Sequence, residues 1–317
     1  MNYASGTAED LSSWFQRQGQ KVTSSESSKW VQAAAGICQA FPYHQLIRPS
    51  EDELQGLLKR YRFIALRYST PLSSNTGHVS YHMVYEKASY LPGMLHKKVR
   101  HDIARGLNHA IYEPVSLERL AAEGWRLQRD TLIRQNRQHA QTEEGWKQMC
   151  LAAGSLAGFQ PWGAIHNGEL VATLLSFTQD DTVTILFQQS STDHIQFGIN
   201  NALTYVFTHE TMLHPGIHCI FYGLHSLDAP PTVDQFKVRM GYTAKPVRQR
   251  VVFHPAAQPF VNSTSHLLLK KIKKLLPGNC TVSKAEGIFR FYLQGCLPLY
   301  KQTWPKVMED MKSELLT

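Results

Sequence analysis

Cysteine is scarce in this sequence, and its placement excludes two common kinds of small stabilised domain. The chain has five cysteines in 317 residues, scattered without a C-x-x-C motif. An odd number of scattered cysteines argues against a disulfide framework, and the missing motif argues against a structural zinc site. We therefore expect a reducing, cytoplasmic environment.

Long hydrophobic runs and a secretion signal are also missing. No run reaches the roughly 18 apolar residues that suggest a transmembrane helix. The first residues, MNYASGTAEDLSSWF, contain no basic region followed by an apolar stretch, so we expect no signal peptide. Charge is unbalanced instead, with 33 Lys and Arg against 25 Asp and Glu and a net charge of +8. This balance favours nucleic acid, phosphorylated ligands or an acidic membrane surface as partners, without choosing among them.

The first third of the chain is predicted to alternate helices and strands after a loosely ordered start. Residues 1–25 are rich in Ser, Gln and Gly, which is typical of a loosely ordered segment. Ser50, followed by Glu53, is a capping box at the start of a helix. The predicted helices are 27–41, 50–61 and 94–107, and the predicted strands are 62–69 and 77–88.

The middle of the chain predicts a longer mixed module with the order β-α-α-β-β-β-α-β-α-β. The predicted helices are 116–138, 143–155, 194–210 and 232–240; strands are predicted at 109–115, 217–224 and 247–255, with three more inside 161–191. An Asn-Gly pair inside 166–169 is typical of a hairpin turn. The pattern indicates an α+β fold with a mixed, mostly antiparallel sheet flanked by helices.

Three stretches of this module are similar to a known family. They are HKKVRHDIARGLNHAIYEPV (96–115), GWRLQRDTLIRQNRQ (124–138) and FYGLHSLDAPPTVDQFKVRMGY (221–242). In this order they resemble a GNAT-type acyltransferase domain, and within that superfamily they are most similar to the Fem-type aminoacyltransferases that build peptidoglycan cross-bridges. The likeness covers about residues 60–255.

The resemblance implies a domain organisation and an activity. Fem-type enzymes usually carry two GNAT domains, so the likeness implies a shortened N-terminal GNAT-like half. The implied division is a flexible N-terminus at 1–25, a partial GNAT-like region at 26–108, a GNAT-like acyltransferase domain at 109–258 and a helical extension at 259–317. The implied activity moves an aminoacyl or acyl group to an amine acceptor, such as a cell-wall precursor or a small metabolite. The donor is a co-substrate, aminoacyl-tRNA or acyl-CoA, and no tightly bound cofactor is expected.

One loop bears on whether the donor is aminoacyl-tRNA or acyl-CoA. GNAT domains bind the coenzyme A pyrophosphate at a helix N-terminus through a Q/R-x-x-G-x-G/A loop, because exposed backbone N–H groups attract anions. The matching segment, SSTDHIQFGINNAL (190–203), has a single glycine, with Ile195 and Asn200 at the other two fingerprint positions. Gln196 and Gly198 are the candidate cofactor contacts, and a plain amphipathic helix is the alternative that these residues alone favour. The loop argues against an ordinary acetyl-CoA enzyme and not against an enzyme that uses aminoacyl-tRNA.

The resemblance also implies a catalytic position. The family implicates the lysine of an F-K pair in the transfer site, and the matching pair is Phe236–Lys237. A fixed cation beside an ester carbonyl can stabilise developing negative charge. The alternative is a solvated lysine on a short helix whose phenylalanine packs in the core. Tyr222 is a further candidate because it lies at a strand end, and packing is the alternative. His225 is a candidate general base, and a loop histidine without a catalytic role is the alternative.

Two basic clusters predict a phosphate-binding surface. Lys97, Lys98 and Arg100 lie on one predicted helix, and Arg134 and Arg137 lie on the next. If the helices are neighbours, they can bind the phosphates of tRNA or of a nucleotide-linked acceptor. The alternatives are a solvated helical face and, for the whole chain, a GNAT-like binding protein without catalysis or an N-acetyltransferase with a degenerate coenzyme A loop.

The helix predicted within 265–278 combines an apolar stripe with four lysines. Such a helix can lie on an anionic membrane surface. The favoured alternative is a helix docked on its own domain, with lysines that reach to solvent. The 15 histidines show no ligand spacing, so no metal site is predicted. The sequence does not indicate an oligomeric state.

Overall fold

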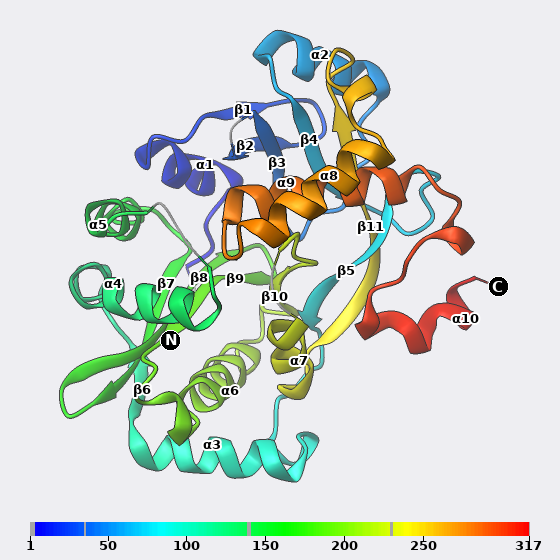
Figure 1. Cartoon of the computed structure of the whole chain (residues 1–317). Helices are drawn as coiled ribbons and strands as arrows, with labels where there is room; N and C mark the ends of the chain where they lie inside the picture. Colours follow the sequence, from blue (N-terminus) through cyan, green and yellow to red (C-terminus); the bar gives the residue numbers. More distant parts are fainter. Residues whose placement is uncertain (1–3, 35, 138–140, 229–230, 317) are drawn as a thin grey trace. The chain divides into compact units, whose positions relative to one another are not determined.

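The computed structural model describes residues 4–34, 36–137, 141–228 and 231–316 (Figure 1). The chain forms two compact units, each assembled from separate segments. The first unit comprises Met1–Gly19, Met83–Gly223 and Pro231–Thr243, and the second comprises Gln20–His82, Leu224–Pro230 and Ala244–Thr317. The contiguous domain limits at 25, 108 and 258 stay a prediction. Among the described residues, no helix is long and apolar enough to cross a bilayer.

The first unit is built on strands in the order β10-β9-β8-β7-β6. Strands β6 to β9 are antiparallel, and β10 runs parallel to β9. The strands are β6 (Ile111–Pro114), β7 (Phe159–His166), β8 (Glu169–Gln179), β9 (Thr182–Ser190) and β10 (Cys219–Leu224). The helices are α1 (Ala8–Arg17), α3 (Lys97–His109), α4 (Leu117–Arg134), α5 (Glu143–Leu151), α6 (Ile199–Met212) and α7 (Pro231–Arg239).

Helices cover both faces of these strands. Gln189 on β9 donates to Gln128 on α4, whereas its neighbour Gln188 accepts from Thr204 on α6. Successive side chains of a strand point to opposite faces, so α4 and α6 lie on opposite sides of β9. The apolar core on the α6 side includes the edge-to-face contact of Trp162 with Phe207, whose ring centroids are 5.8 Å apart.

The second unit has the strand order β1-β2-β3-β4-β11. Strands β3 and β4 are parallel and are joined by α2, while the other neighbouring pairs are antiparallel. The strands are β1 (Val22–Ser24), β2 (Lys29–Ala34), β3 (Ile37–Phe41), β4 (Ala65–Thr70) and β11 (Thr243–Phe253), and β5 (His78–Tyr85) begins in this unit and ends in the first. The helices are α2 (Glu51–Tyr61), α8 (Ser263–Leu275), α9 (Cys280–Gly295) and α10 (Lys312–Leu315).

The predicted α+β class, with a mostly antiparallel sheet and flanking helices, is confirmed. Ser50 caps α2 as predicted, because its hydroxyl accepts from the N–H of Glu53 at 3.1 Å. The Asn-Gly hairpin is also confirmed, since Asn167 and Gly168 have φ of 50° and 85° between β7 and β8. Every helix and strand predicted from residue 50 to residue 255 is present, with ends that differ by a few residues.

The helix predicted at 27–41 is wrong, because this segment forms β2 and β3. Their register pairs Lys29 with Phe41 and Trp30 with Ala40. Ala33 and Ala34, which favour a helix, end β2 instead, and Gly36 beyond them has a φ of 70°. Burial of Trp30 in the core of the second unit outweighs the local helix preference.

The loosely ordered N-terminus is wrong for residues 8–17, which form α1. Thr7 and Asp10 make a capping box, and Leu11, Trp14 and Phe15 are buried. The Trp14 indole also donates to the Met149 carbonyl at 2.9 Å. The prediction rested on the Ser, Gln and Gly content and overlooked three apolar residues at helical spacing. Three such residues are enough to bury one face of a short helix.

Candidate functional site

A parallel pair of strands defines the candidate site in the first unit. Strands β9 and β10 are joined by α6, and their register pairs Thr182–Thr184 with Cys219–Phe221. The carboxyl ends of both strands therefore lie at one edge, together with the N-terminus of the connecting helix. Open α/β sheets bind ligands at such edges. Tyr222 and Gln188 lie beyond the paired residues, toward these carboxyl ends.

Tyr222 joins the two strand ends. Its hydroxyl donates to the side-chain carbonyl of Gln188, which also accepts from Thr204 of α6 at 3.1 Å. Gln188 contacts Asn200 in turn, with its amide nitrogen 3.4 Å from the Asn200 side-chain oxygen. Burial raises the pKa of the Tyr222 phenol, which keeps it protonated at neutral pH. The site edge is thus held by a polar network rather than by apolar packing alone.

Lys237 of α7 brings a buried cation to this edge. Its Nζ donates to the Tyr222 carbonyl at 3.1 Å and lies 4.9 Å from the centroid of the Tyr222 ring. The Asp234 carboxylate is 3.9 Å away, and only 12% of the Lys237 side chain is exposed. Burial lowers the pKa of Lys237, and Asp234 partly opposes this effect. The alternative of a solvated surface lysine is therefore wrong.

Gly223 and Phe236 are the neighbours of Lys237 at this edge. Gly223 has a φ of 123°, and a Cβ added there would lie 3.7 Å from the Lys237 Nζ. Phe236 is half-buried rather than a core anchor, and its carbonyl accepts from the N–H of Met240 at 3.0 Å. The structure therefore places Lys237 against Tyr222 in the first unit, and the catalytic role of the F-K pair stays a prediction.

His225 belongs to the second unit and is packed there. Its Nδ1 lies 3.2 Å from the Ser80 hydroxyl, and its ring stacks on Tyr81 with centroids 4.8 Å apart. Burial, followed by the cations around it, lowers the pKa of His225 well below its ordinary value. An imidazole in this environment accepts a proton poorly, so the geometry favours the packing alternative over a general base.

A buried arginine of the second unit was missed at the level of sequence. Arg67, within β4, is 8% exposed and donates to the side chain of Gln249 and to the His225 carbonyl. Desolvation lowers its pKa to about 9. The sequence signal that could have identified Arg67 is a charged residue inside a predicted strand. A charge buried at such a position needs hydrogen-bonding partners.

The basic residues divide between two settings. Lys97, Lys98 and Arg100 are exposed on the first turns of α3. Arg134 instead donates to the Ser190 hydroxyl at 2.9 Å and to Thr192, so it braces the end of β9. Helix α3 packs on α6, whereas α4, with Arg134 at its end, packs on α5, β8 and β9 (Figure 1). Arg137 is half-buried beyond α4.

Gly198 occupies the position of the predicted coenzyme A loop, but its backbone faces α3. It has a φ of 78°, and a Cβ added there would lie 2.2 Å from the Asp102 carbonyl oxygen. Gly106 of α3 makes the reciprocal approach, with an added Cβ 2.7 Å from the Gly198 oxygen. The two glycines allow α3 and α6 to pack closely. Gln196 is exposed, and its amide lies 3.4 Å from the Asp193 carbonyl.

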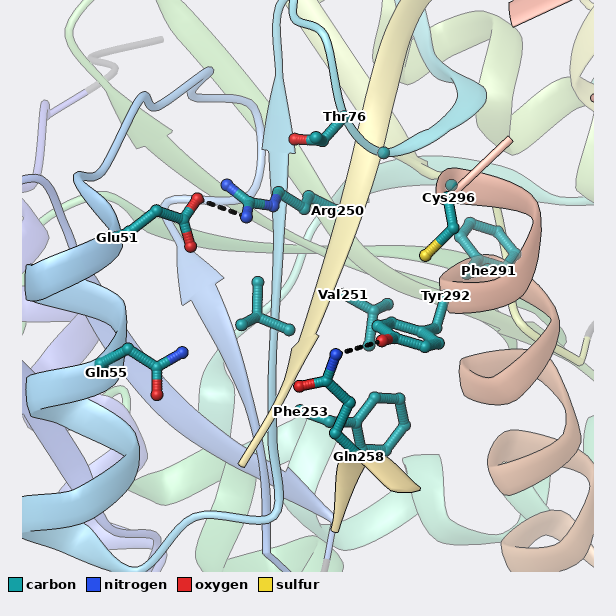
Figure 2. A pocket seen from close by; sticks show the side chains of 13 residues that line it. Glu51, Gln55, Thr76, Arg250, Val251, Phe253, Gln258, Phe291, Tyr292 and Cys296 are labelled. Carbon is teal, nitrogen blue, oxygen red and sulfur yellow. Dashed lines mark hydrogen bonds and ion pairs between the residues drawn. The ribbon is translucent and has the colours of Figure 1, made fainter. Parts of the chain in front are cut away.

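A small pocket lies in the second unit, away from the predicted site residues. Figure 2 shows Arg250 of β11 paired with Glu51 of α2, and Gln258 donating to the Tyr292 hydroxyl at 3.0 Å. Its volume is about 230 Å³, below the usual size of a site for a drug-sized ligand. It therefore carries no substrate assignment.

Comparisons with known proteins identify the fold. No family model and no curated protein sequence matches the chain. Among solved structures, the C-terminal domain of a protein described as a lysylphosphatidylglycerol synthetase from Agrobacterium fabrum has a TM-score of 0.54 at 11% identity, over 86% of this chain and 92% of that chain. FemX gives 0.52 at 9% identity, over 79% and 92%.

The lysylphosphatidylglycerol synthetase structure L-PGS from Bacillus licheniformis gives a TM-score of 0.51 at 10% identity, over 84% of this chain and 98% of that chain. The Fem-like fold predicted from the sequence is confirmed by these structures. At these identities, the likeness concerns the fold.

Proposed function

We propose that the protein is an aminoacyltransferase that moves an aminoacyl group from aminoacyl-tRNA to an amine acceptor. The observation that carries the proposal is the buried cation of Lys237 at the carboxyl end of β10, beside Tyr222. A fold similar to FemX and L-PGS supports it. Burying an ammonium group costs free energy, and a site that must stabilise negative charge is a good reason to retain one.

The chemistry needs one stabilised oxyanion. The acceptor nitrogen attacks the ester carbonyl carbon and forms a C–N bond, and the carbonyl oxygen becomes negative. The ester C–O bond then breaks, and the tRNA ribose oxygen leaves with the proton that the amine gives up. Lys237 would stabilise the oxyanion, and the protonated Tyr222 phenol would keep the strand ends in place through Gln188.

The packing of α3 favours aminoacyl-tRNA over acyl-CoA as donor. The Gly198 N–H, which would face a pyrophosphate in the coenzyme A interpretation, donates to the Ile195 carbonyl at 3.0 Å, and the Cα of Gly198 lies against the Asp102 carbonyl. A direct test measures the melting temperature with coenzyme A and with aminoacyl-tRNA, because a ligand that binds only the folded state raises it. Stabilisation by coenzyme A alone would favour the acyl-CoA alternative.

Reversing the charges of Lys97, Lys98 and Arg100 to glutamate is expected to weaken tRNA binding. These side chains are exposed on α3, where they would bind phosphates. Each tRNA phosphate that is no longer neutralised is expected to reduce the slope of log K against log salt by about 0.7–0.9. Filter binding across a salt series measures this slope.

The matched control reverses Lys270, Lys271 and Lys274 on α8, which are also exposed. It changes the net charge equally and is expected to leave tRNA affinity closer to that of the unmodified protein. Equal decreases in affinity for the two triple variants would show a nonspecific charge effect and would contradict the α3 surface.

A hydroxyl group of a lipid headgroup is a second candidate acceptor, and it would form a C–O bond in place of the C–N bond. It is suggested by the synthetases of similar fold and by α8. Helix α8 is docked, as the favoured sequence interpretation expected, since Lys273 and His266 each lie 3.0 Å from the Glu286 carboxylate of α9. Its outer side nevertheless leaves Leu268 and Leu275 exposed by 58% and 79%. Exposed leucines beside lysines fit an anionic membrane surface, and we include this contact in the proposal.

Changing Leu268 and Leu275 to serine is expected to reduce binding to vesicles containing phosphatidylglycerol by about tenfold or more. Burying a leucine side chain is worth about 1.5–3 kcal/mol, and both side chains would be withdrawn from the interface. Flotation with phosphatidylcholine vesicles is the control. Unchanged flotation of the double variant would contradict the proposed contact of α8 with the membrane.

A further inference from the structure

Three histidines that are far apart in the sequence meet in the first unit. His109 ends α3, His166 ends β7, and His194 lies just before α6. One ring nitrogen from each lies within 4.8 Å of the others, and all three residues are half-buried. Their separations of 57 and 28 residues form no ligand motif, which is why the sequence predicts no metal site.

His166 already donates one ring N–H to a backbone carbonyl, as a metal-binding histidine usually does. Its Nδ1 lies 2.6 Å from the His109 carbonyl oxygen, so this nitrogen carries the proton and donates it. Its Nε2 therefore carries the lone pair, which accepts from the Asn167 amide nitrogen at 3.2 Å. Metal-binding histidines usually donate their second N–H to a carbonyl or carboxylate in this way.

His109 and His194 supply the other two nitrogens. The Nε2 of His109 lies 2.9 Å from the Nδ1 of His194, so a single proton now lies between two ring nitrogens. If this proton moves to the other nitrogen of its own ring, both imidazoles stay neutral and an ion gains two ligands at once.

Packing is the competing explanation for the cluster. The ring of His109 stacks on Phe197 with centroids 4.0 Å apart and on His166 at 4.1 Å, with 12° between the planes in both pairs. A bound metal lies in the plane of each ring that coordinates it. The ring of His166 must therefore tilt away from the stack, giving up its contact with Asn167, when an ion enters.

We propose that His109, His166 and His194 bind one divalent transition-metal ion of the zinc type. Three neutral nitrogen ligands suit zinc and leave a fourth position for water or another ligand. The ion would join the end of α3 to the end of β7 and to the segment that enters α6. This proposal does not depend on the aminoacyl-transfer proposal, because no residue of the cluster takes part in that chemistry.

The test titrates Zn²⁺ and Co²⁺ into full-length protein that has been treated with a chelator. Calorimetry is expected to show one equivalent of Zn²⁺, and Co²⁺ is expected to give the visible absorption of a four-coordinate site. Replacing His194 by alanine is expected to weaken Zn²⁺ binding about tenfold or more and to abolish the Co²⁺ spectrum. His101→Ala, at an exposed position of α3, is the matched control and is expected to bind like the unmodified protein.

The melting temperature without metal shows whether His194→Ala remains folded, and His166→Ala supplies a second variant if it does not. Zn²⁺ is expected to raise the melting temperature of the unmodified protein and of His101→Ala, but not that of the cluster variants. Absence of stoichiometric binding would overturn the proposal. Equal affinity of the unmodified protein and both cluster variants would overturn it as well.

Discussion

Replacing Lys237 by methionine is expected to lower the aminoacyl-transfer rate by about 10²–10³-fold, the usual effect of removing one donor that stabilises an oxyanion. Methionine fills much of the space of the lysine stem and removes only the charged head. The Tyr222 carbonyl loses one donor, which costs about 1 kcal/mol of stability. Burying the charge was itself unfavourable, so the fold is expected to survive. Single-turnover transfer and thermal unfolding, measured on the same preparation, separate these effects.

The sign of the pH effect follows from the lowered pKa of Lys237. At pH values below its folded pKa, the protein bears the full cost of the buried charge. This cost decreases as the pH rises from the folded pKa toward the ordinary value of 10.5, because the folded state then holds the neutral amine. The stability advantage of Lys237→Met is therefore expected to be largest at neutral pH and to shrink in alkaline solution.

Lys147→Met is the matched control for Lys237→Met. Lys147 lies on α5 in an exposed pair with Glu143, with Nζ 3.0 Å from the carboxylate. The aminoacyl-transfer rate of the Lys147→Met variant is expected to equal that of the unmodified protein. Full activity of a folded Lys237→Met variant would show that Lys237 only anchors α7 to β10, and it would leave the aminoacyltransferase proposal without its main support.

Replacing Gly198 by alanine is expected to cost about 2–5 kcal/mol of stability. The left-handed φ of 78° costs a non-glycine residue about 1–2 kcal/mol, and overpacking typically adds about 1–3 kcal/mol. The new Cβ would lie 2.2 Å from the Asp102 carbonyl oxygen, which belongs to the backbone of α3 and moves only if the helix moves. Chemical denaturation measures the decrease in the free energy of unfolding.

Gly19→Ala separates backbone strain from the clash. Gly19 has a φ of 75°, and an added Cβ there would meet no atom within 4 Å. It is expected to show the strain alone, so its destabilisation should be clearly smaller than that of Gly198→Ala. Equal destabilisation of the two variants would mean that α3 shifts freely and that the N-terminus of α6 can open for a phosphate.

Capping, turn and periodicity rules predicted most of the helices and strands. They failed where contacts between residues far apart in the sequence determine the secondary structure. Ser50 and the Asn167–Gly168 turn act through hydrogen bonds and dihedral preferences within a few residues, so the sequence reveals them. The segment around Trp30 has a helical composition, yet strand pairing and burial place it in a sheet. The N-terminal helix was hidden because Trp14 gains its stability from the core of the first unit.

The candidate site follows the same division. A resemblance suggested Lys237 and a strand end suggested Tyr222, and their contact joins residues only 15 positions apart. The burial of Arg67 and the meeting of His109, His166 and His194 depend on the topology of the strands. Long-range groupings of this kind leave no periodic pattern in one sequence, and they become visible only when the chain is folded.

The most direct test of the central claim follows the loss of aminoacyl ester from a mixture of charged tRNAs. The purified protein is incubated with this mixture and a panel of amine acceptors and anionic lipids, and acyl-CoA donors are tested in parallel. The account predicts that ester loss speeds up with an acceptor, and that this depends on Lys237. Transfer from acyl-CoA alone, or no acceptor-dependent ester loss from any charged tRNA across the panel, would contradict it.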